Sequence, residues 1–339
     1  MIRRLISLFA FMTALLLAVP AAALACGGLV APGHAEVLRR ATTLAAWHAG
    51  NEHYVTGFQF VGSADRFGYI IPLPGIPTKI QKGGGWTLER LVREANPIPE
   101  GVALLAAASA GKDVDVLQRV KVDALNITVV RGGGRDVAAW AEKNGFDLTP
   151  DTPRVMSAYS SSGAIFALAK FDNKEAVKRG LVEGQGTVIH FTIPTKAPWI
   201  PLRILALGKA PSEQVNADLF VLTDDRPTLS AGPKYQSPLK FKKSEAASAQ
   251  LLADLRSDRG MQWLPAQGMW FTALSLDAPA RTVGYDLSIN GGGPTGGVGT
   301  LVAPPVPAWT WWVVSLLLLA TGGALFVLWR GSPTPLRPA

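Results

Sequence analysis

The chain of 339 residues contains one cysteine and four histidines, and charged residues make up only 17% of it. A single cysteine cannot form an internal disulfide, so the fold depends on core packing rather than on cross-links. Cysteine and histidine are also the ligands that zinc prefers, and none of the common metal-ligand spacings occurs in the sequence. We therefore expect neither a metal ion nor a cofactor.

Charge is missing altogether from a stretch near the N-terminus. Two arginines precede an apolar run over residues 5–19, and the tripeptide Ala-Leu-Ala directly before Cys26 fits the rule for signal-peptidase cleavage. This pattern predicts a signal peptide over residues 1–25, with Cys26 as the first residue of the mature chain. An uncleaved N-terminal anchor is the alternative, but the run is shorter than the about 20 residues that a bilayer span needs.

Charge is also missing from residues 308–329 near the C-terminus. At about 1.5 Å per residue a helix of this length spans a hydrocarbon core of about 30 Å, and tryptophans stand at both of its ends, where headgroups lie. Arginines follow it, which predicts a cytoplasmic basic tail over residues 330–339. The sequence thus predicts a single-pass type I membrane protein. Its body lies outside the cytoplasm, in the periplasm or at the cell surface.

The body has only a small excess of basic over acidic residues. The formal net charge is +8, but once the four arginines of the two end segments are set aside, 29 basic residues face 25 acidic ones. Nucleic-acid binding calls for a concentrated basic face, so we expect no nucleic-acid partner. Lys234, Lys240, Lys242 and Lys243 form a local cluster, which predicts a solvated loop or a contact with anionic envelope material.

The body, residues 26–289, predicts a strand-rich α+β extracytoplasmic domain with a few short helices, as one domain or two sub-domains. A Gly/Pro-rich linker over residues 290–307 joins it to the transmembrane helix. Helices are expected over 36–48, 87–95, 136–144 with Asp136 as N-cap, and 245–258. Strands are expected over 53–61, 67–73 as a hairpin with the preceding strand, 120–130, 164–171 at the centre of a sheet, 187–193, 202–207, 219–222, 270–276 and 285–289.

The order of several short motifs resembles a bacterial family known as domain of unknown function 2330 (DUF2330). The motifs are CGG after the signal peptide, GSADRFGYIIPLPGIP, TLERLVREANP, NITVVRGGGRDVAAWAEKNGFDL, YSSSGAIFALAKF, TIPTKAPWIPLRI, DLFVLTDDR and WFTALSLDAPARTVGYDLSI. The resemblance implies an exported or envelope-anchored protein, and it brings no catalytic residues. Family members often carry a second cysteine just after CGG, where this chain has Leu29 and Val30. A family disulfide at that point is therefore absent.

Candidate catalytic residues are few. Ser109 and Lys112 have the S-x-x-K spacing of Ser-Lys acyl enzymes, but Gly111 would end the helix that this motif needs. Cys26 has three open fates: a small buried apolar residue, a lipidation site, or an N-terminal thiol nucleophile activated by its own amine. We interpret Gly132–Gly134 as a tight turn rather than an anion site.

The histidines offer a weak set of metal-ligand candidates. His34, His48 and His53, with Glu52, are near one another in sequence but lack metal-ligand spacing. The predicted helix places His48 on an apolar stripe, where a core histidine is usual. The predicted strand places His190 on a polar face, where a surface histidine is usual.

These observations favour a membrane-anchored extracytoplasmic protein that acts as a non-catalytic binding or structural module of the cell envelope. Its partners would be an envelope polymer or a membrane protein. Two alternatives stay open. One is an envelope hydrolase or thiol enzyme with an unrecognised site, and the other is an accessory subunit of a membrane complex that associates through the span.

Overall fold

The computed structural model describes residues 28–30, 37–61, 68–96, 117–178, 187–232, 237–294 and 300–301. The chain divides into two units, Met1–Leu301 and Val302–Ala339, and every described residue lies in the first. Outside the described residues lie the predicted signal peptide, Cys26, His34, Ser109, Lys112 and the predicted transmembrane helix over 308–329. In the part that is described, no helix is both long and apolar enough to cross a membrane.

The structure confirms a strand-rich α+β fold, and its largest sheet has seven strands in the order β13-β14-β11-β2-β3-β9-β5. The strands are β2 (Val37–His48), β3 (Asn51–Val61), β5 (Lys79–Lys82), β9 (Ile189–Pro194), β11 (Gln214–Thr223), β13 (Leu239–Ala246) and β14 (Trp270–Pro279). Neighbouring strands pair antiparallel, except that β2 and β11 run parallel. The carboxyl ends of β2 and β11 therefore meet at one edge of the sheet.

Two smaller antiparallel sheets complete the strand framework. The five-stranded sheet has the order β1-β4-β8-β7-β6, and the four-stranded sheet has the order β10-β15-β12-β16. The strands of the five-stranded sheet are β1 (Gly28–Val30), β4 (Gly68–Leu73), β6 (Gln118–Val122), β7 (Leu125–Val130) and β8 (Ile165–Phe171). Those of the four-stranded sheet are β10 (Trp199–Ile200), β12 (Leu229–Ser230), β15 (Leu287–Ile289) and β16 (Thr300–Leu301).

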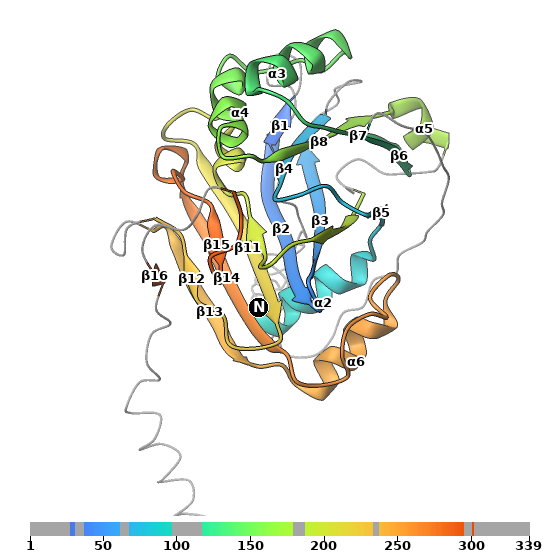
Figure 1. The fold of residues 1–339 in the computed structure, drawn as a ribbon, viewed down its shortest axis with the longest axis vertical. Helices are drawn as coiled ribbons and strands as arrows, with labels where there is room; N and C mark the ends of the chain where they lie inside the picture. The colour runs from blue at the N-terminus through green and yellow to red at the C-terminus, as the bar shows by residue number, and fades with distance from the viewer. Residues whose placement is uncertain are drawn as a thin grey trace, which may run out of the picture. The chain divides into compact units, whose positions relative to one another are not determined.

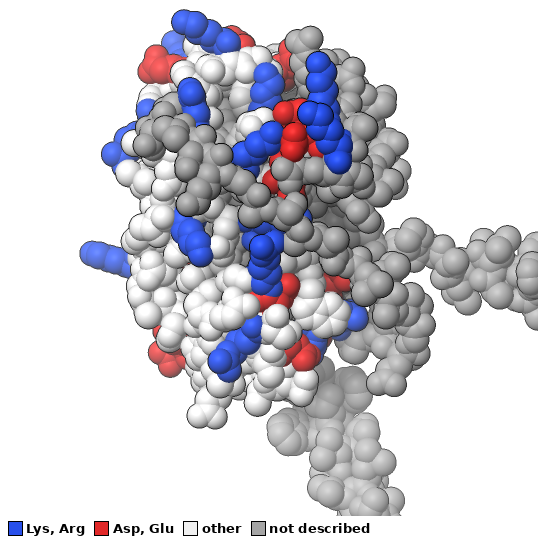
Figure 2. Space-filling view, turned by 90° about the vertical axis from the view of Figure 1, so that its right-hand side faces the viewer, with Lys and Arg blue, Asp and Glu red and all other residues white. Residues whose placement is uncertain are grey.

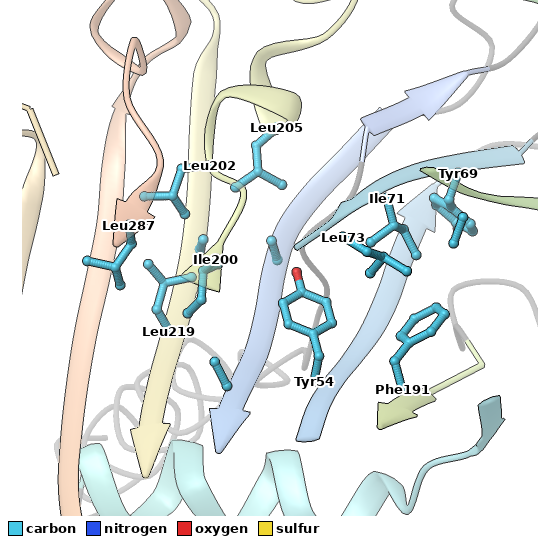
Figure 3. Close-up of a cluster of buried hydrophobic side chains, with 14 of the residues drawn as sticks. Tyr54, Tyr69, Ile71, Leu73, Phe191, Ile200, Leu202, Leu205, Leu219 and Leu287 are labelled. Carbon is cyan, nitrogen blue, oxygen red and sulfur yellow. The ribbon is translucent and has the colours of Figure 1, made fainter. Parts of the chain in front are cut away.

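The largest apolar core lies between the sheets. Figure 3 shows side chains of both larger sheets in this one cluster, among them Tyr54 and Phe191 of the seven-stranded sheet and Ile71 and Leu73 of the five-stranded sheet. Alternate residues of the same strands point the other way, because successive side chains of a strand face opposite sides. We call the side of the seven-stranded sheet that carries Tyr54 its core-side face.

Helices cover the outer face of each large sheet (Figure 1). The helix α2 (Gly85–Ala95) and the helix α6 (Ala249–Ser257) pack on the seven-stranded sheet, on what we call its helix-side face. The helices α3 (Gly134–Lys143) and α4 (Thr152–Ser160) pack on the five-stranded sheet. The remaining helices are α5 (Asn173–Lys178) and the 3-10 turns η2 (Arg203–Ala206) and η3 (Ala280–Thr282). The result is a layered fold of helices, sheet, sheet and helices.

The prediction of a helix over residues 36–48 is wrong, because this segment is the strand β2 at the centre of the largest sheet. Residues 41–46 are all buried, since the core lies on one face and helices on the other. A strand buried on both faces carries small and apolar residues throughout and loses the alternation that identifies a strand. The apolar residues of such a strand also match the spacing of an apolar stripe on a helix, which is why the sequence predicts a helix here.

Four further features differ from the prediction. The expected strand over 120–130 is a hairpin of β6 and β7, which turns at Asp123 with φ of 50°. The expected hairpin partner of β3 is β4, which instead joins β1 and β8 in the other sheet. Residues 203–206 form the turn η2 rather than a strand. Asp136 lies inside the first turn of α3, whose N-cap is Gly133.

Charges are dispersed over the surface. Figure 2 shows basic side chains spread over one face with acidic side chains beside several of them. Lys82 pairs with Asp123 at 2.6 Å, and Lys121 lies 3.5 Å from Glu175. Of the lysine cluster expected in a loop, Lys240, Lys242 and Lys243 lie on the edge strand β13, where Lys243 contacts Glu94 of α2, and Lys234 lies outside the described residues. Lysines on an edge strand discourage pairing with other chains.

Candidate functional site

The turn between β2 and β3 sets the geometry of the histidines. Ala49 and Gly50 both have positive φ, of 48° and 80°, which is the pattern of a two-residue type I′ hairpin turn. The turn fixes a register in which His48 lies opposite Asn51 and Ala46 lies opposite His53. Because residues directly opposite share a face, His48 and His53 are diagonal neighbours on the helix-side face.

His48 makes a close contact with the neighbouring parallel strand. Its Nδ1 lies 2.6 Å from Oδ1 of Asp224, the residue that follows β11. Each side chain is 37% exposed, so the pair stands at the surface. The two residues meet because β2 and β11 run parallel and end at the same edge of the sheet. The interpretation of His48 as a core histidine is therefore wrong.

His53 begins a buried chain of hydrogen-bonding side chains. His53 Nδ1 lies 2.9 Å from His190 Nε2, and His190 Nδ1 lies 3.1 Å from Gln81 Nε2. These residues come from β3, β9 and β5, which are consecutive in the sheet. His53 is 9% exposed and His190 is 1% exposed. We call His53, His190 and Gln81 the relay.

The environment keeps both relay imidazoles neutral. Burial lowers the pKa of His53 to about 3, and the positive charges of His190, His48 and Lys79 act in the same direction. Burial likewise lowers the pKa of His190 to about 4, assisted by Lys79. The indole of Trp263 stacks on the His53 ring, with centroids 3.5 Å apart and planes 7° apart. This stacking fixes the orientation of the His53 ring.

Glu52 faces the opposite side of the sheet from His53. Its carboxyl is fully buried, and Oε1 accepts a hydrogen bond of 3.1 Å from the main-chain N–H of Trp199. Burial raises its pKa to about 8, against the smaller opposing effect of that hydrogen bond. Oε2 has no hydrogen-bond partner within the described part of the chain. Glu52 therefore cannot share a ligand with the histidines.

The same edge of the sheet carries two half-buried tryptophans on the core-side face. Trp47 lies in β2 directly before its last residue, His48, and Trp270 begins β14 opposite Thr223. Trp47 Nε1 donates to the carbonyl of Thr195 at 2.9 Å, and Trp270 Nε1 donates to Ser244 Oγ at 3.1 Å. The guanidinium of Arg226 lies 5.4 Å from the centre of the Trp270 ring. We call Trp47, Thr223, Arg226 and Trp270 the aromatic rim.

The structure brings together some of the residues that the sequence singled out. His48 and His53 share a face, whereas Glu52 does not join them. No group of three or more His, Cys, Asp or Glu side chains that could hold a metal ion occurs in the described ranges. Gly132 and Gly133 lie between β7 and α3, and the N–H of Gly134 donates to Ser160 Oγ.

Sequence reasoning missed His190, Gln81 and Asp224 as partners of these histidines. The alternation of residues 189–193 correctly placed His190 opposite the core, but that opposite face is covered by helices instead of water. The contact of Asp224 with His48 depends on the parallel pairing of β11 with β2. Long-range pairing of this kind leaves no local signal in the sequence.

A protein-family model described as an uncharacterized protein conserved in bacteria (DUF2330) matches residues 20–235. No curated protein matches the chain. Among solved structures, the chain is similar to baculovirus P35, at 8% identity and a TM-score of 0.39, over 76% of this chain and 95% of that one. A mutated baculovirus P35 after caspase cleavage matches at 8% identity and a TM-score of 0.31, over 73% and 95%. Likeness at these scores carries no argument about this chain.

Proposed function

The chain belongs to the bacterial family DUF2330, whose model covers well over half of it, and from this premise we propose that it is a membrane-anchored extracytoplasmic protein that binds a polysaccharide of the cell envelope without catalysing a reaction on it. The sequence supports the location. A signal-peptide pattern at one end and an apolar span with a basic tail at the other predict a body displayed outside the cytoplasm.

The aromatic rim is the observation that carries the binding proposal. Trp47 and Trp270 stand on one face of the sheet with the strand β11 between their strands, so about 10 Å separates them along the sheet. Both indole N–H groups donate within the protein, which fixes the rings before any ligand arrives. Rigid aromatic side chains lose little conformational entropy on binding and are common anchors of binding surfaces.

A sugar polymer suits this surface chemically. An indole offers a flat apolar face, and the apolar C–H faces of a sugar ring can stack on it while hydroxyl groups reach polar neighbours. Arg226, whose guanidinium lies 5.4 Å from the centre of the Trp270 ring, supplies hydrogen-bonding groups beside that ring. Two rings about 10 Å apart along the sheet are too far apart to stack on one sugar ring, so they favour a polymer over a single sugar.

The proposal is tested by sedimentation of the detergent-solubilised full-length chain with purified peptidoglycan sacculi. We expect Trp47→Ala and Trp270→Ala to weaken binding at least tenfold each, a loss of about 1.4 kcal/mol. Trp86→Ala is the matched control, because Trp86 is also half-buried and carries an arginine, Arg93, over its ring, but belongs to α2. Equal binding by all three variants and the wild type would overturn the proposal.

The location is tested separately. Protease added to intact spheroplasts should degrade the body and spare a tag placed after Ala339, since the basic tail is predicted to be cytoplasmic. Protection of the body together with loss of the tag would reverse the orientation.

A further inference from the structure

We propose that His48 and His53 together bind a divalent transition-metal ion, with Zn²⁺ as the representative, through their Nε2 atoms. Asp224 holds the His48 ring, and the relay holds the His53 ring and sets its tautomer through the orientation of the Gln81 amide. The site is distinct from the aromatic rim, since it lies on the helix-side face of the same sheet edge. Its two protein ligands leave the remaining coordination positions to water.

The strand register brings the two rings together. His48 and His53 are diagonal neighbours across the β2–β3 ladder, and diagonal Cβ atoms lie about 7 Å apart. Imidazole rings at that separation can bring both Nε2 atoms to the about 2.0–2.1 Å that a Zn–N bond needs. The tight turn at Ala49 and Gly50 holds the register, and Trp263 holds the His53 ring plane.

Each ring already has the outer partner that a metal-bound histidine normally has. A ligating imidazole usually gives its second N–H to a carboxylate or another acceptor, which fixes the tautomer and raises the basicity of the ligand. His48 Nδ1 lies 2.6 Å from Asp224 Oδ1, and His53 Nδ1 lies 2.9 Å from His190 Nε2. Neither His48 nor His53 has a hydrogen bond at Nε2 among the described residues.

The relay decides whether His53 offers a lone pair. In the observed orientation the Gln81 amide nitrogen lies 3.1 Å from His190 Nδ1 and donates to it. His190 then carries its proton on Nε2 and donates to His53 Nδ1, so His53 also carries its proton on Nε2 and cannot bind a metal there. With the amide turned over, its oxygen accepts from His190 Nδ1, His190 Nε2 accepts from His53 Nδ1, and His53 Nε2 is free to bind the metal. A 180° rotation of an amide exchanges these two states without a change of shape.

One nearby charge opposes the site. Lys79 on β5 is close enough to lower the pKa of both relay histidines, so its positive charge also repels a bound cation. The Asp224 carboxylate beside His48 opposes that repulsion. The balance predicts a site of moderate affinity.

The test is a Zn²⁺ titration of the full-length chain in detergent against a chromophoric chelator, after EDTA treatment and its removal. We expect one site per chain, and we expect His48→Ala and His53→Ala each to weaken it at least tenfold. Asp224→Asn should weaken it about tenfold. Asp225→Asn removes the same charge one residue away and contacts none of the described histidines, so it should leave the affinity within about twofold. Circular dichroism confirms that each variant is folded.

Two results would overturn the inference. One is no saturable Zn²⁺ binding by the wild type, and the other is unchanged affinity in both histidine variants. Equal losses in Asp224→Asn and Asp225→Asn would also contradict it, because they would show that general charge, rather than the partner of His48, sets the affinity.

Discussion

The fully buried carboxyl of Glu52 receives a hydrogen bond from the main-chain N–H of Trp199, at 3.1 Å, and so joins β3 to β10 across 147 positions of the chain. Because burial raises the pKa of Glu52 to about 8, this carboxyl is mostly protonated at neutral pH. Folding therefore takes up a proton wherever the unfolded chain has already lost it.

The first prediction is that the raised pKa of Glu52 makes the stability of the protein depend on pH. Relative to Glu52→Gln, the wild type should have its full stability below about pH 4.5 and lose it as pH rises through about 8, with a slope of about 1.4 kcal/mol per pH unit. Denaturant unfolding of both chains from pH 5 to 9, with EDTA present, gives the difference directly. A difference that does not change with pH would contradict the buried acid.

The second prediction concerns the start of helix α2. Asp258 Oδ2 accepts hydrogen bonds of 2.7 Å from both the N–H and the Oγ1 of Thr87, so it caps the helix from a distant segment. Asp258→Ala should lower the free energy of unfolding by about 2–3 kcal/mol, because two buried donors lose a charged acceptor.

The control for this prediction is Asp136→Ala in α3. Asp136 lies in the first turn of its helix and makes no capping hydrogen bond to the described residues, so its loss should cost only about 0.3–1 kcal/mol through the helix dipole. Equal effects of the two substitutions on urea unfolding would mean that the contact with Thr87 adds nothing.

The third prediction concerns the β2–β3 turn. Ala49 has φ of 48°, a conformation that costs alanine about 1 kcal/mol and suits asparagine better. Ala49→Asn should therefore raise the free energy of unfolding by about 0.5–1 kcal/mol. Gly50→Ala, at φ of 80° with no atom within 4 Å of the added Cβ, should lower it by about 1 kcal/mol. A destabilised Ala49→Asn variant would argue against the type I′ turn.

The fourth prediction uses the relay to control metal affinity. Gln81→Glu can only accept from His190 Nδ1, so it should fix the relay in the state that frees His53 Nε2 and raise Zn²⁺ affinity about tenfold. Lys79→Gln makes the same change of charge without touching the relay. If both variants raise the affinity equally, the effect is electrostatic and the relay has no part in it.

The sequence predicted the helices and strands whose hydrophobic pattern can be recognised within the segment itself. The helix over 87–95 and the strands over 164–171 and 187–193 stand close to their expected bounds. Leu251, Leu252 and Leu255 face inward from α6, as their spacing predicts. These segments are amphipathic or flanked by helix-ending residues, so their own residues specify them.

The segments that the sequence did not predict depend on distant partners. The strand β2 is buried by β3, β11, helices and the core, so its small residues carry no alternation. The strand β4, expected to pair with the preceding strand, pairs instead with β1 and β8 of the other sheet. The candidate site joins β2, β3, β5, β9 and the end of β11, and such an assembly cannot be derived from spacing along the chain.

Hydrogen–deuterium exchange of the detergent-solubilised full-length chain, with and without soluble peptidoglycan strands, tests the binding function most directly. We expect the strands to slow exchange in peptides that cover residues 46–48, 223–226 and 269–271, which carry the aromatic rim, and to leave residues 85–95 of α2 unchanged. Unchanged exchange at all three rim segments with saturating strands, or slowing confined to α2, would contradict binding at the rim.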